Sequence, residues 1–455
     1  MICHLLPFLE NCPVLYHVNL TLLNLSSFYI VCCFLPLYFA SYFVYNERKE
    51  GFNQAIMEAV LLAAGEGKRM HPLTYTRPKV MLPIVNKPIL EHLLLEIKEA
   101  GITQFLFVVG YHAETVRSYF GNGDKWGVNI EYVTQMQQRG TASAVKRAEG
   151  RVGDRFLVVN GDIIARAKDI RKLLKAEDTS LILAEMTDPA NVGAVEVEGA
   201  MVKRIQEKTL KPLSRLANAG VYLLTKEIFP AIAACPFSPR GDYDLTDAVQ
   251  CVIDSGRRVG YYTTEYWLNA DYPWELLEAN ERFLADLETE NAAEIDKNVT
   301  IKGKVSSGRG THIKAGTYIE GPVVIGENCT VGHLCHLRPG TTIGTNCHIG
   351  GMVEIKNSII MNNARISSQA FIADSVVGED CFIGAGTRVG NIRLDGKNIK
   401  AAGIDTGRKE LGAIIGDRVN TGVNASIDAG TLIGNNCIIG PGALVGGVIL
   451  PNSIL

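Results

Sequence analysis

The chain has 455 residues, with 45 Lys or Arg against 48 Asp or Glu and a formal net charge of −3. This length predicts two or three domains, and the balanced charge gives no reason to expect nucleic acid as a partner. With 47% hydrophobic and 20% charged residues, the composition argues against a disordered chain. Eleven cysteines in so long a chain do not indicate a disulfide scaffold, and a zinc cluster is not expected without a C-x-x-C pair.

The first 56 residues differ from the rest. No Asp, Glu, Lys or Arg occurs from Asn11 to Asn46, and residues 28–45 are apolar enough for a short membrane span. A secretory signal needs a basic start, which this segment lacks. We expect residues 1–56 to be an extension outside a cytoplasmic enzyme that starts at Met57. The alternative is a genuine membrane anchor, which would place the full-length chain in the membrane.

Residues 57–290 alternate apolar strands with amphipathic helices. Buried strands are predicted at residues 106–109 and 156–159, and a helix is predicted to start at Pro88 and to end at Gly101. This alternation predicts an α/β domain with a parallel, doubly wound sheet. Ligands of such sheets bind beyond the carboxyl ends of the strands.

A glycine-containing loop follows the first predicted strand. Its small residues allow backbone amides to approach a phosphate or a base, and a basic pair, Lys68 and Arg69, follows them. The loop matches neither a Walker motif nor a dinucleotide fingerprint. The whole run from Leu62 to Pro88, with Pro78-Lys79 and Lys87-Pro88, resembles the signature of the sugar-1-phosphate nucleotidylyltransferases. These enzymes couple a nucleoside triphosphate to a sugar 1-phosphate and release pyrophosphate, and their catalytic domain is Rossmann-like.

The resemblance implies a role for each matching residue. Arg69 and Lys79 are the expected catalytic residues, Arg69 on the triphosphate and Lys79 on the phosphates of both substrates. Mg²⁺ is expected at Asp162 and Asn269. The nucleotide-binding residues are expected to be Ala63, Ala64, Gly65, Gly67, Gln135, Gly140 and Thr141, and the sugar-binding residues Gly193, Glu207, Lys208 and Asn218.

Several of these residues have an alternative interpretation. Gln135 could be a surface strand end, and Asp162 could be an ordinary helix N-cap. Glu207 and Lys208 could form an exposed charge pair. Asp271 lies close enough to Asn269 to take its place.

The C-terminal third, from about residue 295, carries a repeat of six residues. Apolar side chains recur at residues 313, 319, 325, 331, 337, 343, 349 and 355, and the phase shifts near residues 360 and 377. This period is typical of a parallel β-helix. Four cysteines share one repeat position and are expected to be stacked interior residues: Cys329, Cys347, Cys381 and Cys437. The resemblance implies a left-handed β-helix over residues 295–455 that assembles into a homotrimer.

The order of the two domains resembles bifunctional enzymes, in their archaeal form, that acetylate glucosamine 1-phosphate from acetyl-CoA and couple the product to UTP. The residues that match the acetyltransferase cleft are Arg338, Lys356, Ala385 and Asn391. The family's catalytic histidine falls at Ser368, and serine is no base unaided at neutral pH. We therefore expect acetyl transfer to be weak or absent.

The sequence as a whole predicts an Mg²⁺-dependent nucleotidylyltransferase, with UTP and N-acetylglucosamine 1-phosphate as the expected substrates and acetyl-CoA as a second substrate if the cleft is active. One alternative is a glucose-1-phosphate thymidylyl- or uridylyltransferase, and another is a mannose-1-phosphate guanylyltransferase. In both alternatives the β-helix would be structural or regulatory. A non-enzymatic regulatory subunit is disfavoured because Arg69, Lys79 and Asp162 are all present.

Overall fold

The computed structural model describes residues 57–186, 192–207, 212, 214–235 and 241–455. The expected extension 1–56 and the candidate sugar ligand Lys208 therefore lie outside the described residues. Within the described ranges, every helix is too short or too polar to cross a bilayer.

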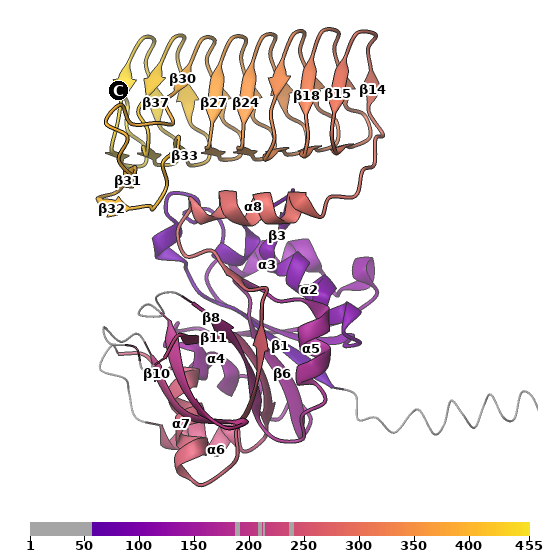
Figure 1. The fold of residues 1–455 in the computed structure, drawn as a ribbon, viewed down its shortest axis with the longest axis vertical. Helices are drawn as coiled ribbons and strands as arrows, with labels where there is room; N and C mark the ends of the chain where they lie inside the picture. Colours follow the sequence, from indigo (N-terminus) through magenta and orange to yellow (C-terminus); the bar gives the residue numbers. More distant parts are fainter. Residues whose placement is uncertain (1–56, 187–191, 208–211, 213, 236–240) are drawn as a thin grey trace, which may run out of the picture. The chain divides into compact units, whose positions relative to one another are not determined.

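A nine-stranded sheet organises residues 58–264 (Figure 1). Its strand order is β5-β4-β1-β6-β11-β8-β12-β10-β9. Its strands are β1 (Glu58–Ala63), β4 (Gln104–Val109), β5 (Asn129–Thr134), β6 (Arg155–Asn160), β8 (Ser180–Glu185), β9 (Gly193–Glu198), β10 (Met201–Glu207), β11 (Leu216–Thr225) and β12 (Gly260–Thr264).

The sheet is mixed, so the prediction of a parallel sheet was only half correct. Strands β5, β4, β1 and β6 run parallel, whereas β11 runs antiparallel to both of its neighbours β6 and β8. Helices connect the parallel strands, but β9 and β10 are joined by a tight turn at Gly199, and such a turn can only join antiparallel strands. The Rossmann-like half is thus the part that carries the signature loop after β1.

Helices cover both faces of this sheet because the strand residues alternate between two apolar clusters. In β1, Ala59 and Leu61 belong to the cluster that includes α2, α3 and α5, while Val60 belongs to the cluster that includes α4, α6 and α7. The helices are α2 (Ile89–Glu99), α3 (Ala113–Phe120), α4 (Thr141–Lys146), α5 (Ala167–Leu173), α6 (Ile228–Ala234), α7 (Leu245–Asp254) and α8 (Glu275–Ala285).

Short elements hold the loops of the signature segment, residues 67–88. It contains the 3-10 helices η4 (Lys68–Met70) and η5 (Lys79–Met81) and the small hairpin of β2 (Pro83–Ile84) and β3 (Lys87–Pro88). A second small pair joins β7 (Ile163–Ile164) to β13 (Leu268–Asn269), and η6 (Asp124–Trp126) lies in the connection before β5.

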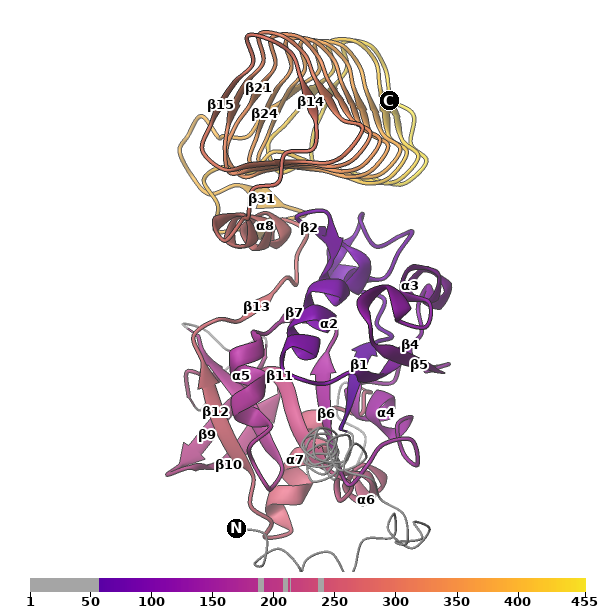
Figure 2. The same cartoon turned by 90° about the vertical axis from the view of Figure 1, so that its right-hand side faces the viewer.

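From Glu294 onward the chain forms a parallel β-helix, which confirms the interpretation of the repeat. Figure 2 shows its coils stacked behind one another, in a view roughly along the axis of the β-helix. It consists of three parallel sheets of eight strands each. The first sheet comprises β14 (Glu294–Ile295), β17 (His312–Ile313), β20 (Thr330–Val331), β23 (His348–Ile349), β26 (Arg365–Ile366), β29 (Phe382–Ile383), β34 (Asn420–Thr421) and β37 (Ile438–Ile439).

The second sheet, called the cleft sheet here, comprises β15 (Thr300–Lys302), β18 (Tyr318–Glu320), β21 (His336–Leu337), β24 (Glu354–Lys356), β27 (Phe371–Ala373), β30 (Arg388–Val389), β35 (Ser426–Ile427) and β38 (Leu444–Val445). The third, the interface sheet, comprises β16 (Val305–Ser307), β19 (Val323–Ile325), β22 (Thr341–Ile343), β25 (Ile359–Ile360), β28 (Val376–Val377), β33 (Ile414–Ile415), β36 (Leu432–Ile433) and β39 (Val448–Ile449). A hairpin of β31 (Lys400–Ala401) and β32 (Ile404–Asp405) leaves the coils between β30 and β33.

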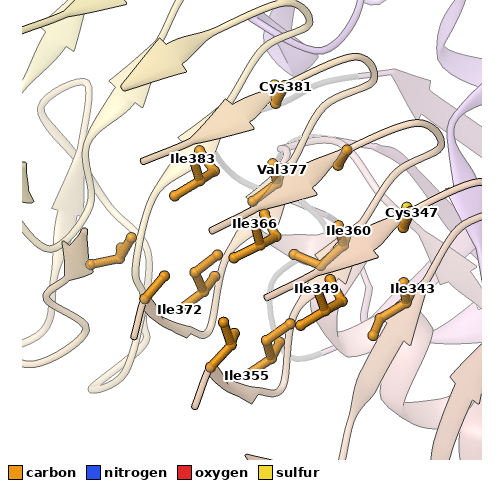
Figure 3. Packing of buried hydrophobic residues seen from close by; sticks show 14 of the residues in the cluster. Ile343, Cys347, Ile349, Ile355, Ile360, Ile366, Ile372, Val377, Cys381 and Ile383 are labelled. Carbon is orange, nitrogen blue, oxygen red and sulfur yellow. The ribbon is translucent and has the colours of Figure 1, made fainter. Parts of the chain in front are cut away.

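The interior of the β-helix is a stack of mostly apolar side chains, and most strands contribute one of them (Figure 3). Val331 pairs with Ile349, 18 residues on, whereas Ile349 pairs with Ile366, 17 residues on, which explains the shift of phase near residue 360. The four cysteines are buried, and the amide of Cys347 donates to Sγ of Cys329 at 3.4 Å, so their prediction as stacked interior residues is confirmed.

The interface sheet is apolar on its outer side as well. Ile360, Val377 and Ile415 point into the coil and belong to its interior cluster. Their neighbours Ile359, Val376 and Ile414 point the other way and share a second cluster with Met70, Leu73, Leu82 and Ile84 of the signature segment. The nucleotidyltransferase-like part and the β-helix therefore bury apolar surface against each other.

Candidate active site

A cavity of about 710 Å³ opens beyond the carboxyl ends of β1 and β6, where the fold predicts a ligand site. The predicted nucleotide-binding residues Ala64, Gly65, Gly67, Gln135, Gly140 and Thr141 all line it. Ala63 is the exception among the predicted residues, because it is buried as the last residue of β1 and does not reach the cavity.

Gly67 has to be glycine for two independent reasons. Its φ of 71° lies in the left-handed region, and an added Cβ would lie 2.8 Å from Cβ of Lys79. The loop therefore packs directly against the base of the Lys79 side chain.

Lys79 is the centre of the charged groups in the cavity. Its Nζ donates to Oδ2 of Asp162 at 2.6 Å, to Oδ1 of Asp271 at 3.2 Å and to Oδ1 of Asn269 at 3.4 Å. The guanidinium of Arg69 donates to Oδ1 of Asp271 at 3.0 Å. Two cations thus converge on one face of the cavity, and Asp271 bridges them.

Burial opposes the charged form of both Lys79 and Asp162. Their mutual attraction outweighs it, because the carboxylates of Asp162 and Asp271 raise the pKa of Lys79, and the ammonium group of Lys79 lowers the pKa of Asp162. Both groups are therefore ionised at neutral pH. Glu275, in contrast, has a raised pKa because it is buried, and its Oε2 accepts the amide of Asp271 at 2.5 Å.

Asp162 is not a helix N-cap, because the residues that follow it form the strand β7. Asn269 is brought beside it by the antiparallel pairing of β13 with β7, in which Asn269 faces Ile163. The described residues contain no group of three or more His, Cys, Asp or Glu that could cage a metal. One carboxylate and one amide oxygen still fit Mg²⁺, which takes oxygen ligands and completes its shell with phosphates and water.

Gln135 is buried rather than a surface strand end. Its side-chain amide donates to the carbonyl of Gly140 at 3.1 Å, so it orders the turn that enters α4. Gly140 has a φ of 86°, and an added Cβ would lie 2.4 Å from the carbonyl oxygen of Tyr243. Thr141 accepts the amide of Leu245 at 2.9 Å, which ties this turn to the start of α7.

A second cavity, of about 180 Å³, adjoins the first. The two share Arg69, Asp162 and Asp271, so a ligand in either reaches the same charged groups. The predicted sugar-binding residues Gly193, Glu207 and Asn218 line it, and Glu207 accepts a hydrogen bond from Thr246 at 3.1 Å. Glu207 is therefore a lining residue of the smaller cavity.

Some residues of the site were not predicted. Asp271 was considered only as a competitor of Asn269, yet it contacts both Arg69 and Lys79. Thr246 and Trp267 line the smaller cavity from α7 and from the segment before β13. Both residues could have been found from their place in the sequence. Thr246 closely follows the Asp242-Tyr243-Asp244 run, and Trp267 precedes Asn269 by two residues.

The predicted acetyltransferase-like residues lie along the cleft sheet. At one end, the buried carboxylate of Asp374 accepts hydrogen bonds from Lys356 at 3.4 Å and from Asn391 at 2.7 Å. Arg338 lies one coil away and donates to Glu354 at 3.0 Å. Ser368 and Ala385 lie at the other end, in the turns that precede β27 and β30. Strand β27, which is three residues and about 10 Å long, lies between the two ends.

Comparison with known proteins agrees with this geometry. The family model described as "Nucleotidyl transferase" matches residues 58–285, "GMPPB C-terminal domain" matches residues 319–405, and "Hexapeptide repeat of succinyl-transferase" matches residues 412–446.

Curated relatives match both parts of the chain. The bifunctional protein GlmU of Methanocaldococcus jannaschii is 37% identical over 394 residues, which is 86% of this chain and 95% of the relative. The bifunctional sugar-1-phosphate nucleotidylyltransferase/acetyltransferase of Sulfurisphaera tokodaii is 35% identical, over 86% of this chain and 97% of the relative. The low-salt glycan biosynthesis nucleotidyltransferase Agl11 of Haloferax volcanii is 31% identical, over 72% of this chain and 94% of the relative. The chain therefore belongs to the GlmU-type sugar-1-phosphate nucleotidylyltransferases, in which a nucleotidyltransferase domain precedes a hexapeptide-repeat β-helix.

Proposed function

We propose that the enzyme transfers the uridylyl group of UTP to N-acetylglucosamine 1-phosphate and releases pyrophosphate. The observation that carries the proposal is the convergence of Arg69, Lys79 and Asp162 where the two cavities adjoin. The larger cavity has room for the triphosphate and its base, and the smaller one for the sugar. The preference for UTP and N-acetylglucosamine rests on the two-domain resemblance.

In the proposed reaction, a phosphate oxygen of the sugar 1-phosphate attacks the α-phosphorus of the triphosphate. A new P–O bond forms at the α-phosphorus as the bond from this phosphorus to the α,β-bridging oxygen breaks. The electron pair of the broken bond leaves with pyrophosphate. Negative charge develops on the transferred group, and fixed cations stabilise it. Arg69 binds the triphosphate, and Lys79 spans the phosphates of the two substrates. Lys79 acts as a cation and not as a base, because its pKa is raised.

Asp162 and Asn269 are the proposed ligands of Mg²⁺. When bound, the ion would neutralise phosphate oxygens and orient the triphosphate. Because Asn269 contributes a neutral oxygen, we expect weaker metal binding than two carboxylates would give.

The residues that match the acetyltransferase cleft keep the features expected for a sugar phosphate at one end only. Arg338, Lys356 and Asn391 supply polar and basic groups, while Ser368 stands where a general base is required. We propose that acetyl transfer from acetyl-CoA is weak or absent. His336 and His348 lie on other coils and are the remaining candidates for a base.

The second candidate function is nucleotidyl transfer to a different sugar 1-phosphate, or from a nucleoside triphosphate with a different base. The match of residues 319–405 to the GMPPB C-terminal domain favours a mannose-1-phosphate guanylyltransferase. The alternative of a glucose-1-phosphate thymidylyl- or uridylyltransferase is supported only by the match to the nucleotidyl transferase family model.

One experiment separates these candidates. Pyrophosphate release by the full chain is measured with Mg²⁺, pairing UTP, dTTP and GTP with the 1-phosphates of N-acetylglucosamine, glucose and mannose. We expect the highest kcat/KM for UTP with N-acetylglucosamine 1-phosphate. Lys79→Met should lower kcat by about 10²–10³-fold, as expected for one fixed transition-state donor. Preference for another pair would replace the proposed substrates, and an active Lys79→Met variant would refute the role of Lys79.

We also propose that residues 57–290 and 295–455 act as two domains and that the β-helix assembles the enzyme as a homotrimer. In support, α8 ends at Ala285 and the first coil begins at Glu294. Leu334 and Met352 are exposed in the turns of adjacent coils, as expected for residues covered by a neighbouring subunit.

A further inference from the structure

The signature segment faces the active site on one side and the β-helix on the other. Lys79 points into the cavity, but the two residues that precede Pro78 point the opposite way, to the β-helix. The guanidinium of Arg77 donates to Oδ2 of Asp417 at 2.6 Å, and its Nη1 lies 2.9 Å from Oε1 of Glu379. The hydroxyl of Thr76 also donates to Oδ2 of Asp417.

This contact is a buried ion pair with a fixed geometry. The side chains of Arg77 and Asp417 are 10% and 3% exposed, and that of Glu379 is 30% exposed. The second carboxylate oxygen of Asp417 accepts the amide of Glu379 at 2.8 Å, so the anion is anchored to the backbone of a neighbouring coil. A buried cation with two carboxylates around it has few alternative positions, because each alternative leaves a charge unpaired.

The distance along the chain from this anchor to the catalytic lysine is two residues. Pro78 lies between them, and its ring restricts the backbone torsion φ, which is −71°. Lys79 begins η5, whose first bond runs from the amide of Met81 to the carbonyl of Pro78 at 2.9 Å. Gly67, in the loop after β1, packs so closely on Lys79 that Lys79 has no space to move toward this loop. The position of Arg77 therefore determines the position of Lys79.

The far end of the same segment is also held by the β-helix. The fully buried Asn280 of α8 accepts the amide of Val85 at 2.9 Å and donates to the carbonyl of Gly340 at 3.0 Å. Asn86 donates to the carbonyl of Ile343 at 2.7 Å. The β-helix thus contacts the segment on both sides of Lys79.

We infer that the β-helix forms part of the support of the nucleotidyl-transfer site, with Asp417 and Glu379 as positioning residues that hold Lys79 through Arg77. This inference rests on the proposed role of Lys79. It gives the β-helix a function in nucleotidyl transfer that does not depend on acetyl transfer.

The test compares four single variants of the full chain: Asp417→Asn, Glu379→Gln, Lys79→Met and the control Asp296→Asn. Asp296 is also a β-helix carboxylate, and its contacts are with His312 at 2.8 Å and the amide of Ala315 at 3.0 Å, both within the coils. The assay measures kcat, KM for each substrate and the melting temperature, with kinetics recorded well below the melting transition.

We expect Asp417→Asn to lower kcat by about tenfold or more, because a displacement of about 1 Å can cost up to 10²-fold. KM should change by less than about threefold, since the other residues that line the cavity stay in place. Glu379→Gln should lower kcat by about threefold, and Asp296→Asn should match the parent enzyme. A purely structural contact would lower the melting temperature and leave kcat of the folded enzyme unchanged.

The inference is refuted if folded Asp417→Asn keeps the parental kcat while Lys79→Met is inactive. If Asp417→Asn does not fold, Glu379→Gln decides the question, because the Glu379 side chain is more exposed: a loss in kcat supports the inference, and a parental kcat overturns it. An active Lys79→Met variant would instead refute the proposed role of Lys79, so the two failures are distinguishable.

Discussion

Replacing Lys79 by methionine should destabilise the fold as well as the transition state. Methionine keeps the unbranched chain but leaves Asp162 and Asp271 facing each other without the cation between them. Removing one partner of a buried ion pair costs about 3–5 kcal/mol. Because the Asp162 side chain is 34% exposed, we expect the lower end of that range. A loss of about 3 kcal/mol should lower the melting temperature by about 6–12 °C for a domain of this size.

The pH dependence of the melting temperature shows whether the lost ion pair causes the destabilisation of Lys79→Met. The pKa of Asp162 is lowered, so its stabilising effect is present above its ordinary value of 3.8 and is lost as the pH falls through the lowered pKa. The pKa of Lys79 is raised, so its effect is present below its ordinary value of 10.5 and is lost as the pH rises through the raised pKa. The difference in melting temperature should therefore be constant between about pH 5 and 9 and shrink in more acidic buffer.

Thermal melting of the parent and the variant, followed by circular dichroism between pH 3.5 and 9, measures this difference. Lys87→Met is the matched control, because Lys87 belongs to the same segment but is exposed on β3. It should melt within about 2 °C of the parent, as for a surface change of about 0.5 kcal/mol. An equal loss for the two lysines, or a Lys79→Met loss that stays the same at pH 3.5, would show that lost packing and not the ion pair is responsible.

Three further changes test other parts of the site. Gly67→Ala should lower kcat by at least tenfold in a steady-state pyrophosphate assay, because its Cβ would lie 2.8 Å from Cβ of Lys79; the exposed Gly150→Ala, with nothing within 4 Å, controls for the loss of a left-handed glycine. Asn269→Asp should reduce the Mg²⁺ concentration for half-maximal rate several-fold in a metal titration, and an unchanged midpoint would exclude residue 269 as a ligand. Ser368→His should raise thiol release from acetyl-CoA and glucosamine 1-phosphate by about 10²-fold; no gain would mean that the missing base is not what limits this cleft.

The β-helix could be predicted in detail because its signal is local. Most strands contribute one interior position, and the interior residues from Ile313 to Ile355 recur every six residues, a pattern that needs no long-range information to be recognised. The convergence of Arg69, Lys79 and Asp162 on one cavity was also predictable, since they lie in one ordered run of motifs. Here the resemblance supplied roles that composition and spacing could not.

Other features depend on contacts between distant parts of the chain. Asp271 reaches Arg69 across 202 positions, and no local pattern distinguishes its carboxylate from a loop residue. The antiparallel direction of β11 follows from its pairing with β6 and β8, which the alternation of strands and helices does not specify. The same limit applies to Arg77, whose partners lie 302 and 340 positions away.

One long-range feature did leave a signal in the sequence. In the interface sheet, apolar residues occur in adjacent pairs, Ile359-Ile360, Val376-Val377, Ile414-Ile415 and Leu432-Ile433. A β-helix strand needs only one of each pair for its interior, because successive side chains point to opposite faces. In an isolated β-helix the outer residues would form an exposed apolar stripe, which soluble domains avoid. Such doubled positions therefore indicate that another part of the chain covers this sheet, and in this enzyme the signature segment and α8 share its outer apolar cluster.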